Sequence, residues 1–382
     1  MRWNIVKSLI NIGMQKEKYY NLQPILDIDA HYRMIIGRRS NGKTYVVQKF
    51  CLQKYHETGR AVAIVRRLAV DFTSKTGQNY WEGVVNDGLI EEYTDGKYDS
   101  VFYQSMRWWF CKRDPETGKK MLSPKPFAYF FPLNTWEHDK GPSYPDINTI
   151  VFEEFISTVG MGYLRDEFVI FMNVISTIIR QRDEHFDIFM LGNTINMYGC
   201  PYFKEMGIDH IKYMKQGTIE VYKYGDTGNS VAIEYIHDRD DIDSTPTNSY
   251  YAFNNPKLDM ITHGAWEVDV HPHLTPELYY KYEDVKYKYY MIYEGELLQC
   301  NIIVKDGYFY TYIHEKTTPI PKNNKSLIYT QEHFADKLHR RSIFKPMTEK
   351  EKRIQWFFKH DRVFYQNNMV GEIVANFLRD MD

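Results

Sequence analysis

The segment that most constrains this chain is HYRMIIGRRSNGKTYVVQKF, residues 31–50. It matches the phosphate-binding pattern G-x-x-x-x-G-K-[ST] through Gly37, Arg38, Arg39, Ser40, Asn41, Gly42, Lys43 and Thr44. The apolar residues 34–36 predict the end of a buried strand, and residues 45–50 predict a helix. Because this pattern requires a loop between a strand and a helix, we expect an α/β nucleotide-binding domain.

The chemistry of this loop follows from its backbone. Glycines allow successive N–H groups to point inward at phosphate oxygens, and the N-terminus of the following helix adds positive potential. Lys43 is expected to reach the outer phosphates, and the Thr44 hydroxyl is expected to hold Mg²⁺. The expected ligands are therefore ATP and Mg²⁺.

A second motif is TIVFEEF, residues 149–155, in which an apolar strand ends in two acids. This is the Walker B pattern. Glu153 is expected to hold the hydration shell of Mg²⁺, and Glu154 is expected to orient and polarise the attacking water. The alternative interpretation is a strand followed by two solvated acids.

A helix is predicted from Leu164 to about Arg182, and an apolar strand follows it with Asn193 at its tip. In P-loop ATPases this tip lies beside the γ-phosphate, where an amide can sense hydrolysis. Asn193 is equally compatible with a turn. Arg180 and Arg182 end the predicted helix, where they would serve either as catalytic arginines or as solvated cations that interact with the helix dipole.

The length of 382 residues predicts two domains. The net charge of -2 means that any basic, nucleic-acid-binding surface must be local. The four cysteines are scattered without a C-x-x-C pair, which argues against a disulfide framework or a zinc site and fits a reducing cytoplasm. No apolar run is long enough to span a bilayer, so no membrane association is expected.

The pattern along the chain predicts three parts. Residues 1–240 read as the P-loop ATPase domain, with a short amphipathic helix at the N-terminus. Residues 241–276 are rich in Pro, Asn and Asp and read as a linker. Residues 277–382 begin with three strands of an antiparallel meander, followed by a short strand and two helices.

Beyond these patterns, the chain resembles the DNA-packaging ATPases of phi29-like tailed phages, which are small relatives of terminase large subunits and belong to the additional-strand, catalytic-glutamate P-loop ATPases. The resemblance covers roughly residues 30–240. It rests on the phosphate-binding loop and on residues 64–67, 136–155, 178–182, 191–193 and 196–203. The most specific piece is WEHDKGPSYPDINTIVFEEF, residues 136–155.

The resemblance implies a ring, pentameric in this family, that docks at a procapsid portal and holds double-stranded DNA in its pore; a structural packaging RNA is a further candidate partner. Arg180 matches the family's arginine finger, which acts on the ATP of the neighbouring subunit, and Arg182 and Lys140 are further trans-acting candidates. Such a motor would work in the cytoplasm of the infected bacterium and be absent from the mature virion. The chain departs from the family at Glu153, where Asp is usual.

The C-terminal part resembles the RNase H-like nuclease domain of terminases. That chemistry needs a cluster of carboxylates that hold two metals, but the first predicted strand, residues 287–293, has no acid at its centre. We therefore expect a degenerate domain that binds DNA or the portal without nuclease activity.

DNA tracking requires basic side chains that contact phosphates without reading bases. The candidates are Arg66, Arg67 and Lys75, with a second basic set in the C-terminal part. Two other functions stay open at this point. One is a nucleotide-dependent small-molecule kinase, which would not explain Glu154 or the second domain. The other is a structural portal-associated protein with an inert P-loop.

Overall fold

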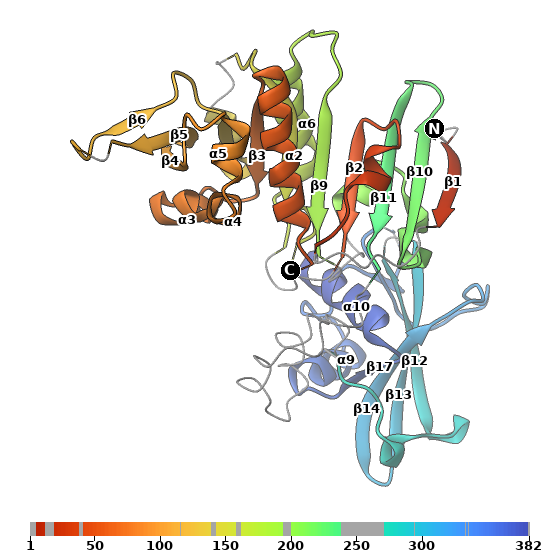
Figure 1. Ribbon diagram of the computed structural model, residues 1–382. Coiled ribbons are helices and arrows are strands. Elements are labelled where there is room, and N and C mark those ends of the chain that lie inside the picture. Colours follow the sequence, from red (N-terminus) through yellow and green to blue (C-terminus); the bar gives the residue numbers. More distant parts are fainter. Residues whose placement is uncertain are drawn as a thin grey trace. The chain divides into compact units, whose positions relative to one another are not determined.

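The computed structural model of this chain describes residues 5–11, 19–37, 41–114, 116–138, 143–157, 162–193, 200–237, 271–293, 295–332, 334 and 336–380. The chain divides into two compact units, Met1–Ser244 and Thr245–Asp382, shown in Figure 1. Residues 241–270, the larger part of the predicted linker, lie outside the described residues.

The first unit contains an eleven-stranded mixed sheet in the order β1-β10-β11-β2-β9-β8-β3-β7-β5-β4, with β6 paired to β5. Its strands are β1 (Ile5–Asn11), β2 (Tyr32–Ile36), β3 (Ala61–Arg66), β4 (Ser100–Gln104), β5 (Arg107–Arg113), β6 (Lys120–Leu122), β7 (Ala128–Pro132), β8 (Ile147–Glu153), β9 (Asp187–Gly192), β10 (Thr218–Tyr224) and β11 (Asn229–Tyr235).

The centre of this sheet is parallel and positions the two predicted motifs. Strand β2 leads into the P-loop and β8 carries the Walker B acids, and β9 lies between them, parallel to both. The Asn-tipped strand is thus inserted between the two motif strands, as an additional-strand ATPase requires. The predicted α/β P-loop fold with a mixed sheet is confirmed.

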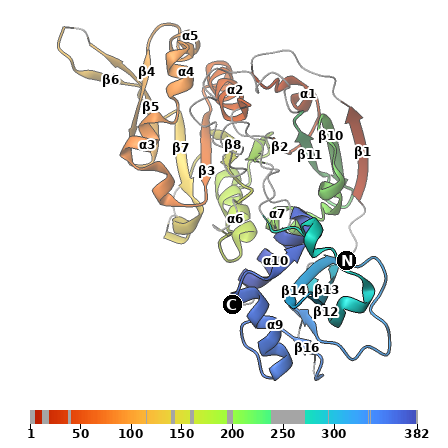
Figure 2. The ribbon, with the colours of Figure 1, turned by 90° about the horizontal axis from the view of Figure 1, so that it is seen from below.

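Helices cover both faces of the parallel strands, as Figure 2 shows for α2 (Lys43–Thr58) and α6 (Glu167–Ile179). Helix α2 ends at Gly59, whose left-handed backbone is a common helix C-terminus. The short helices of this unit are α1 (Gln23–Leu26), α3 (Ser74–Asn79), α4 (Glu82–Asn86), α5 (Leu89–Tyr93) and α7 (Pro201–Glu205).

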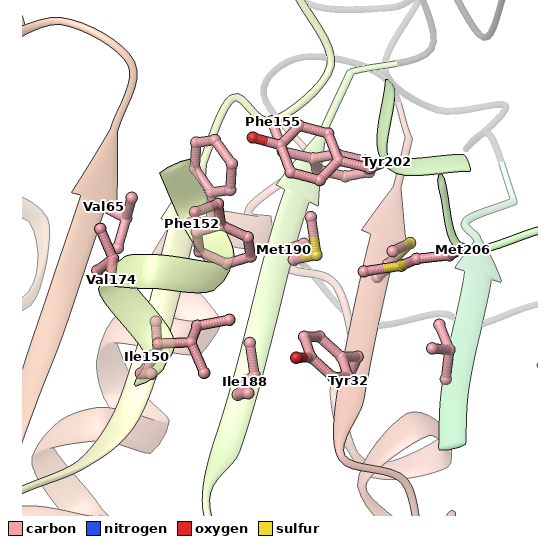
Figure 3. Packing of buried hydrophobic residues seen from close by; sticks show 14 of the residues in the cluster. Tyr32, Val65, Ile150, Phe152, Phe155, Val174, Ile188, Met190, Tyr202 and Met206 are labelled. Atoms are coloured by element: carbon pink, nitrogen blue, oxygen red, sulfur yellow. The ribbon is translucent and has the colours of Figure 1, made fainter. Parts of the chain in front are cut away.

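Each face of the sheet has its own core. On the α6 face, Phe152 of β8 packs against Phe171 of α6 and Tyr202 of α7, with ring centroids 4.8 and 5.4 Å apart; Figure 3 shows this face around Phe152, Phe155 and Tyr202. On the α2 face, Val47 and Leu52 pack in a second buried cluster. Because strands buried on both sides read as continuous apolar runs, β2, β8 and β9 could be found in the sequence.

The N-terminus corrects one sequence prediction. Residues 5–11 were expected in an amphipathic helix, but they form strand β1, which pairs antiparallel with β10 along its whole length. The backbone hydrogen bonds to the sheet edge supply what a helix of this length cannot supply alone, since short isolated helices are marginal in water.

The aromatic residues 101–111 lie in a hairpin of strands β4 and β5. Strands β4 and β5 meet at Ser105 and Met106, both of which have positive φ. This backbone is typical of the tight turns that join antiparallel strands. The turn contains no Gly, Asn or Asp, so the usual sequence signal was missing.

The second unit is built on a six-stranded sheet in the order β16-β15-β12-β13-β14-β17. Its strands are β12 (Val285–Tyr293), β13 (Glu296–Lys305), β14 (Tyr308–Glu315), β15 (Ile328–Thr330), β16 (His339–Arg340) and β17 (Val363–Tyr365), and its longer helices are α9 (Glu349–Lys359) and α10 (Asn368–Asp380). The predicted meander is present as β12–β14, and β15 joins β12 in parallel. Strands β16 and β17 are too short to have been read from the sequence.

Candidate active site at the phosphate-binding loop

The described part of the phosphate-binding loop has the backbone that its glycines predict. Gly42 has φ 87° and immediately precedes α2, and a Cβ there would lie 3.0 Å from the Tyr19 ring. At Gly37, a Cβ would lie 2.6 Å from the Asn41 side chain. Both positions therefore exclude larger residues. Arg38, Arg39 and Ser40 lie outside the described residues.

Lys43, at the first position of α2, is only 7% exposed. Its Nζ donates to Gly37 O at 2.9 Å, to Asn41 Oδ1 at 3.2 Å and to Asn193 Oδ1 at 3.3 Å. The structure thus brings the predicted sensor Asn193 to the predicted phosphate ligand, although 150 residues separate them. These three oxygens hold the Lys43 ammonium group beside the loop. The oxygens of a bound phosphate could compete there for its hydrogen bonds.

Thr44 and Glu153 lie side by side, as their predicted roles require. The Thr44 hydroxyl donates to Glu153 Oε2 at 3.1 Å, and the Tyr80 hydroxyl donates to Glu153 Oε1 at 2.9 Å. Burial raises the pKa of Glu153 above its usual range, while Arg66 opposes the shift. Hydroxyl and carboxylate oxygens are the hard donors that Mg²⁺ prefers, so the donor set fits this cation despite the longer Glu side chain.

Glu154 differs from Glu153 in exposure and in backbone. Its φ is 56°, and its side chain is 49% exposed and lies 3.4 Å from the Arg66 guanidinium. Arg66 ends β3, which is the neighbour of β8 in the sheet. One acid of the pair is therefore enclosed beside Thr44, whereas the other is open to water and held by a single cation.

Arg67, one of the predicted DNA contacts, takes part in a buried ion pair. Its guanidinium donates to both carboxylate oxygens of Glu167 at 2.7 and 2.9 Å, and to the carbonyls of Glu154 and Phe155. Glu167 is 1% exposed and also accepts from Tyr202. Such a bidentate buried pair is costly to break, so Arg67 fixes the chain after Walker B. Of the three DNA candidates, Arg66 faces Glu154 and only Lys75, on α3, is exposed.

The two arginines after α6 lie at the other edge of the sheet. Arg180 follows the last residue of α6, is exposed, and has φ 35°. Arg182 donates to the Ile147 carbonyl at 2.7 Å, and Ile147 is the first residue of β8. Since Glu153 ends that strand, Arg182 lies at the opposite end of β8 from the Walker B acids, and Figure 1 shows the connection from α6 to β9 at that end of the sheet.

Arg182 is held in place by several contacts within the chain. Besides Ile147, it donates to the carbonyls of Ile178, Ile179 and Pro145. It also pairs with Glu184 at 2.7 Å. These contacts hold the Arg182 guanidinium between α6 and β8, and the trans-acting roles of Arg180 and Arg182 stay predictions. Lys140, the third candidate, lies outside the described residues.

A buried pair, Tyr20 and Glu234, supports the loop from the side of β11. The Tyr20 hydroxyl donates to the Glu234 carboxyl group, and the Tyr20 N–H donates to the Asn41 carbonyl at 3.1 Å. Burial raises the pKa of Glu234 to about 7. No local sequence pattern indicates this contact, which joins residues 214 positions apart.

This pair predicts a pH-dependent stability. Below about pH 4.5 both folded and unfolded chains protonate Glu234. Between pH 4.5 and about 7 only the folded chain keeps the proton, so the free energy of unfolding falls as the pH rises. The shift of about 2.5 pH units corresponds to about 3 kcal/mol. Glu234→Gln, which still accepts from Tyr20, should be more stable than the parent by up to this amount at pH 8 and similar to it at pH 4.5.

Chemical denaturation of the parent and of Glu234→Gln at both pH values tests this prediction. Glu91→Gln is the matched control, because Glu91 is exposed on α5. Stability profiles of parent and Glu234→Gln that stay parallel from pH 4.5 to 8 would contradict the assigned titration.

Comparison with known proteins shows the family of this chain. Residues 14–209 match the family described as Podovirus DNA encapsidation protein (Gp16). The chain belongs to this family. The matched region contains the P-loop, both Walker B acids, Arg180 and Asn193, whereas Glu234 lies beyond it.

Individual relatives agree with the family. The DNA packaging protein of Bacillus phage phi29 is 26% identical over 191 residues, and that of Bacillus phage B103 is 28% identical over 185 residues. These alignments cover 50% and 48% of this chain and 50% of each relative. The chain thus spans about half the length of the curated relatives that it matches.

A solved structure extends the comparison to the whole fold. "The bacteriophage Phi-29 viral genome packaging motor assembly" contains a chain that aligns with 96% of this one and is itself covered completely, with a TM-score of 0.58 and 19% identity. At this identity the match shows the fold. Both units of the family member described here therefore have counterparts in one known architecture.

Sequence reasoning missed several residues of the site. Tyr80 is identified as part of the site only by its hydrogen bond to Glu153. Tyr19 packs on Tyr45 with ring centroids 4.7 Å apart, beside Gly42. A tyrosine in a chain with 32 of them carries no positional signal of its own, so only the folded structure could select these two.

Proposed function

We propose that this chain is the ATPase of a phage DNA-packaging motor. It would couple ATP hydrolysis to the translocation of double-stranded DNA into a procapsid, as a homo-oligomeric ring at the portal. The observation that carries the proposal is the convergence of Lys43, Asn193, Thr44 and Glu153 at one edge of the sheet. Family membership and the names of the relatives, which are DNA packaging proteins, support the choice of DNA as the substrate.

The residues of this site divide the work of hydrolysis. Mg²⁺, held by Thr44 and with Glu153 beside it, would neutralise charge on the phosphates. Lys43 binds the outer phosphate oxygens, and the backbone N–H groups at the start of α2 add to the attraction. Glu154, whose side chain is half exposed, would accept the proton of the attacking water and orient it. Asn193 reports the presence of the γ-phosphate through its amide.

In a ring, a neighbouring subunit would supply the arginine that the nucleotide site of a single chain lacks. Arg180 lies on the edge opposite its own P-loop, so it would complete the site of a neighbouring subunit and stabilise the transferred phosphoryl group. A pentamer is the proposed stoichiometry, with the portal and a structural packaging RNA as partners. The motor would act in the cytoplasm of the infected host and leave the mature virion. None of the described helices is long and apolar enough to cross a membrane.

The second unit is proposed as an RNase H-like domain without nuclease activity, which binds DNA or the portal. The nine residues of its central strand β12 include no acid, and among the residues that the structure describes no group of three metal-binding side chains occurs. Two-metal cleavage needs such a group. In the second basic set, Lys337, Arg340, Arg341 and Lys345, Arg340 pairs with Glu351 at 2.7 Å and is removed from the proposed DNA contacts.

Stimulation of hydrolysis by DNA tests the proposed function. ATP turnover of the purified chain is measured with and without long double-stranded DNA across a salt series. A motor that grips the phosphate backbone should be stimulated, and because binding falls with a log–log slope of about -0.9 per phosphate contact, the stimulation should fade steeply as salt rises. Turnover indifferent to DNA at every salt concentration would favour the small-molecule kinase.

A further inference from the structure

The second unit contains a pocket that the proposed ATPase cycle does not use. It has a volume of about 790 Å³ and lies between α9 and one face of the sheet. Its lining from the sheet is Tyr287, Ile302, Val304 and Phe309, together with Lys286, and its lining from the helix is Lys350, Arg353, Trp356 and Phe357. The pocket is therefore formed by one helix and three consecutive strands of the meander.

The charged side chains that line this pocket are all cationic. Lys286, Lys350 and Arg353 are the charged lining residues, and within the described ranges none of the three lies within 4.0 Å of a carboxylate oxygen. Lys350 sits 5.1 Å from the centre of the Tyr287 ring. By contrast, Lys352 on the same helix pairs with Glu349 at 2.7 Å. The pocket thus combines three positive charges with an apolar floor.

Two large aromatic side chains on the pocket are exposed to an unusual degree. Phe309 is 51% exposed and Trp356 is 42% exposed. The Trp356 ring is stacked on His360 at 4.5 Å, which fixes its orientation. Large exposed apolar groups that gather at one concave place mark binding sites more often than isolated ones do, and the volume lies in the range of small-ligand pockets.

The combination of rings and cations selects among nucleic acids. In a duplex the bases are stacked inside, and the protein meets mainly sugars and phosphates, so aromatic rings in this pocket would have no unpaired base to stack on. Unpaired bases can stack on aromatic side chains while their phosphates meet Lys and Arg. We propose that this pocket binds unpaired nucleotides of single-stranded DNA or RNA, with bases against Trp356 and Phe309 and phosphates at the three cations.

This proposal deepens the role given above to the second unit, and it does not depend on ATP hydrolysis. Binding is measured by fluorescence anisotropy with the full chain and no ATP, using labelled oligothymidine, oligouridine and a mixed-sequence duplex of equal length. Single strands should bind with a log–log salt slope of about -2, from three phosphate contacts at about -0.7 each. The two single-stranded probes distinguish a DNA source from an RNA source.

Three variants locate the site. Trp356→Ala should weaken single-strand binding by about 5- to 140-fold, the effect of one lost base–aromatic stack, whereas Trp356→Phe should retain most of the affinity. Lys350→Ala should reduce the magnitude of the salt slope by about 0.7. Lys352→Ala is the matched control, because Lys352 lies on α9 outside the pocket lining, and it should leave both quantities unchanged.

Other outcomes would overturn the proposal. Equal affinity of the parent and Trp356→Ala for single strands would place their binding elsewhere on the chain. A duplex that binds as tightly as single strands and loses as much affinity in Trp356→Ala would remove the argument from unpaired bases. Displacement of the oligonucleotide by a Glu- and Phe-rich peptide at lower concentration than by unlabelled oligonucleotide would assign the pocket to a protein partner. Because the assay contains no ATP, none of these results bears on the hydrolysis test.

Discussion

Arg180→Ala should lower ATP turnover of the assembled ring by about 10³ to 10⁵, the range measured for loss of an arginine finger. The reason is positional. Arg180 follows α6 at the edge of the sheet where β8 begins, whereas Lys43 and Glu153 lie where that strand ends. A charge at this distance does nothing for its own nucleotide, so the loss should appear only in assembled rings. Turnover is measured at saturating DNA.

Mixing experiments separate action in trans from a structural effect. Glu154→Gln subunits lack the proposed catalytic base but keep Arg180, and Arg180→Ala subunits have the opposite defect. In random mixed rings, roughly a quarter of the head-to-tail interfaces would join an intact Glu154 to an intact Arg180. Partial recovery of hydrolysis in the mixture is therefore expected, although each variant alone is inactive.

Arg165→Ala is the matched control for this experiment, because the Arg165 side chain is 96% exposed and precedes the same helix. It should keep parental turnover. Arg182→Ala should instead lower thermal stability, since it removes the cation bonded to four carbonyls between α6 and β8. If mixed rings of Arg180→Ala and Glu154→Gln showed no recovery although they assembled, the trans-acting role of Arg180 would be wrong.

Lys43→Ala should reduce ATP hydrolysis to background, by at least the factor of about 10² to 10³ that follows loss of one electrostatic contact to a transition state. Lys43 is the buried cation at the loop, and its amine already contacts oxygens of Gly37, Asn41 and Asn193. Its removal takes the positive charge away from the developing charge on the phosphates. The measurement is steady-state phosphate release with and without DNA.

The control for Lys43→Ala is Lys49→Ala, which removes the same side chain from an exposed position of the same helix. It should leave turnover unchanged. Thermal unfolding of both variants shows whether loss of the buried side chain alters the fold, and Lys43→Met, which keeps the length of the chain, covers that case. Turnover of Lys43→Ala at the level of Lys49→Ala would falsify the phosphate-binding assignment and leave the inert structural protein as the better interpretation.

Much of the fold could be predicted because its central elements carry local signals. The strands that end at Ile36, Glu153 and Gly192 are continuous apolar runs, as strands buried on both faces must be. The helix at residues 167–179 and the meander from 285 to 315 followed from periodicity and from glycine turns. The N-terminal strand could not be predicted, because its partner β10 lies more than 200 residues away.

The residues of the site likewise fall into those that the sequence predicted and those that it did not. Residues adjacent to a motif, such as Lys43, Thr44 and Glu154, could be assigned from the motif itself. The partners of these residues could not. Arg66 and Arg67 are consecutive and looked equivalent, yet one faces Glu154 and the other is held in a buried ion pair with Glu167. Which of two neighbouring arginines enters the buried ion pair depends on the geometry of the sheet, and no local sequence pattern encodes it.

The sequence by itself predicted the nucleotide site of this protein, because phosphate binding is a property of a short continuous backbone whose residues stand next to each other in the chain. It also determined the family. The tertiary structure decided which arginines are held inside the fold, since folding brings carboxylates and carbonyls within about 3 Å of Arg67 and Arg182. It also decided where the aromatic and basic residues of the second unit converge, because that pocket takes its walls from three strands and a helix that meet only in the folded chain.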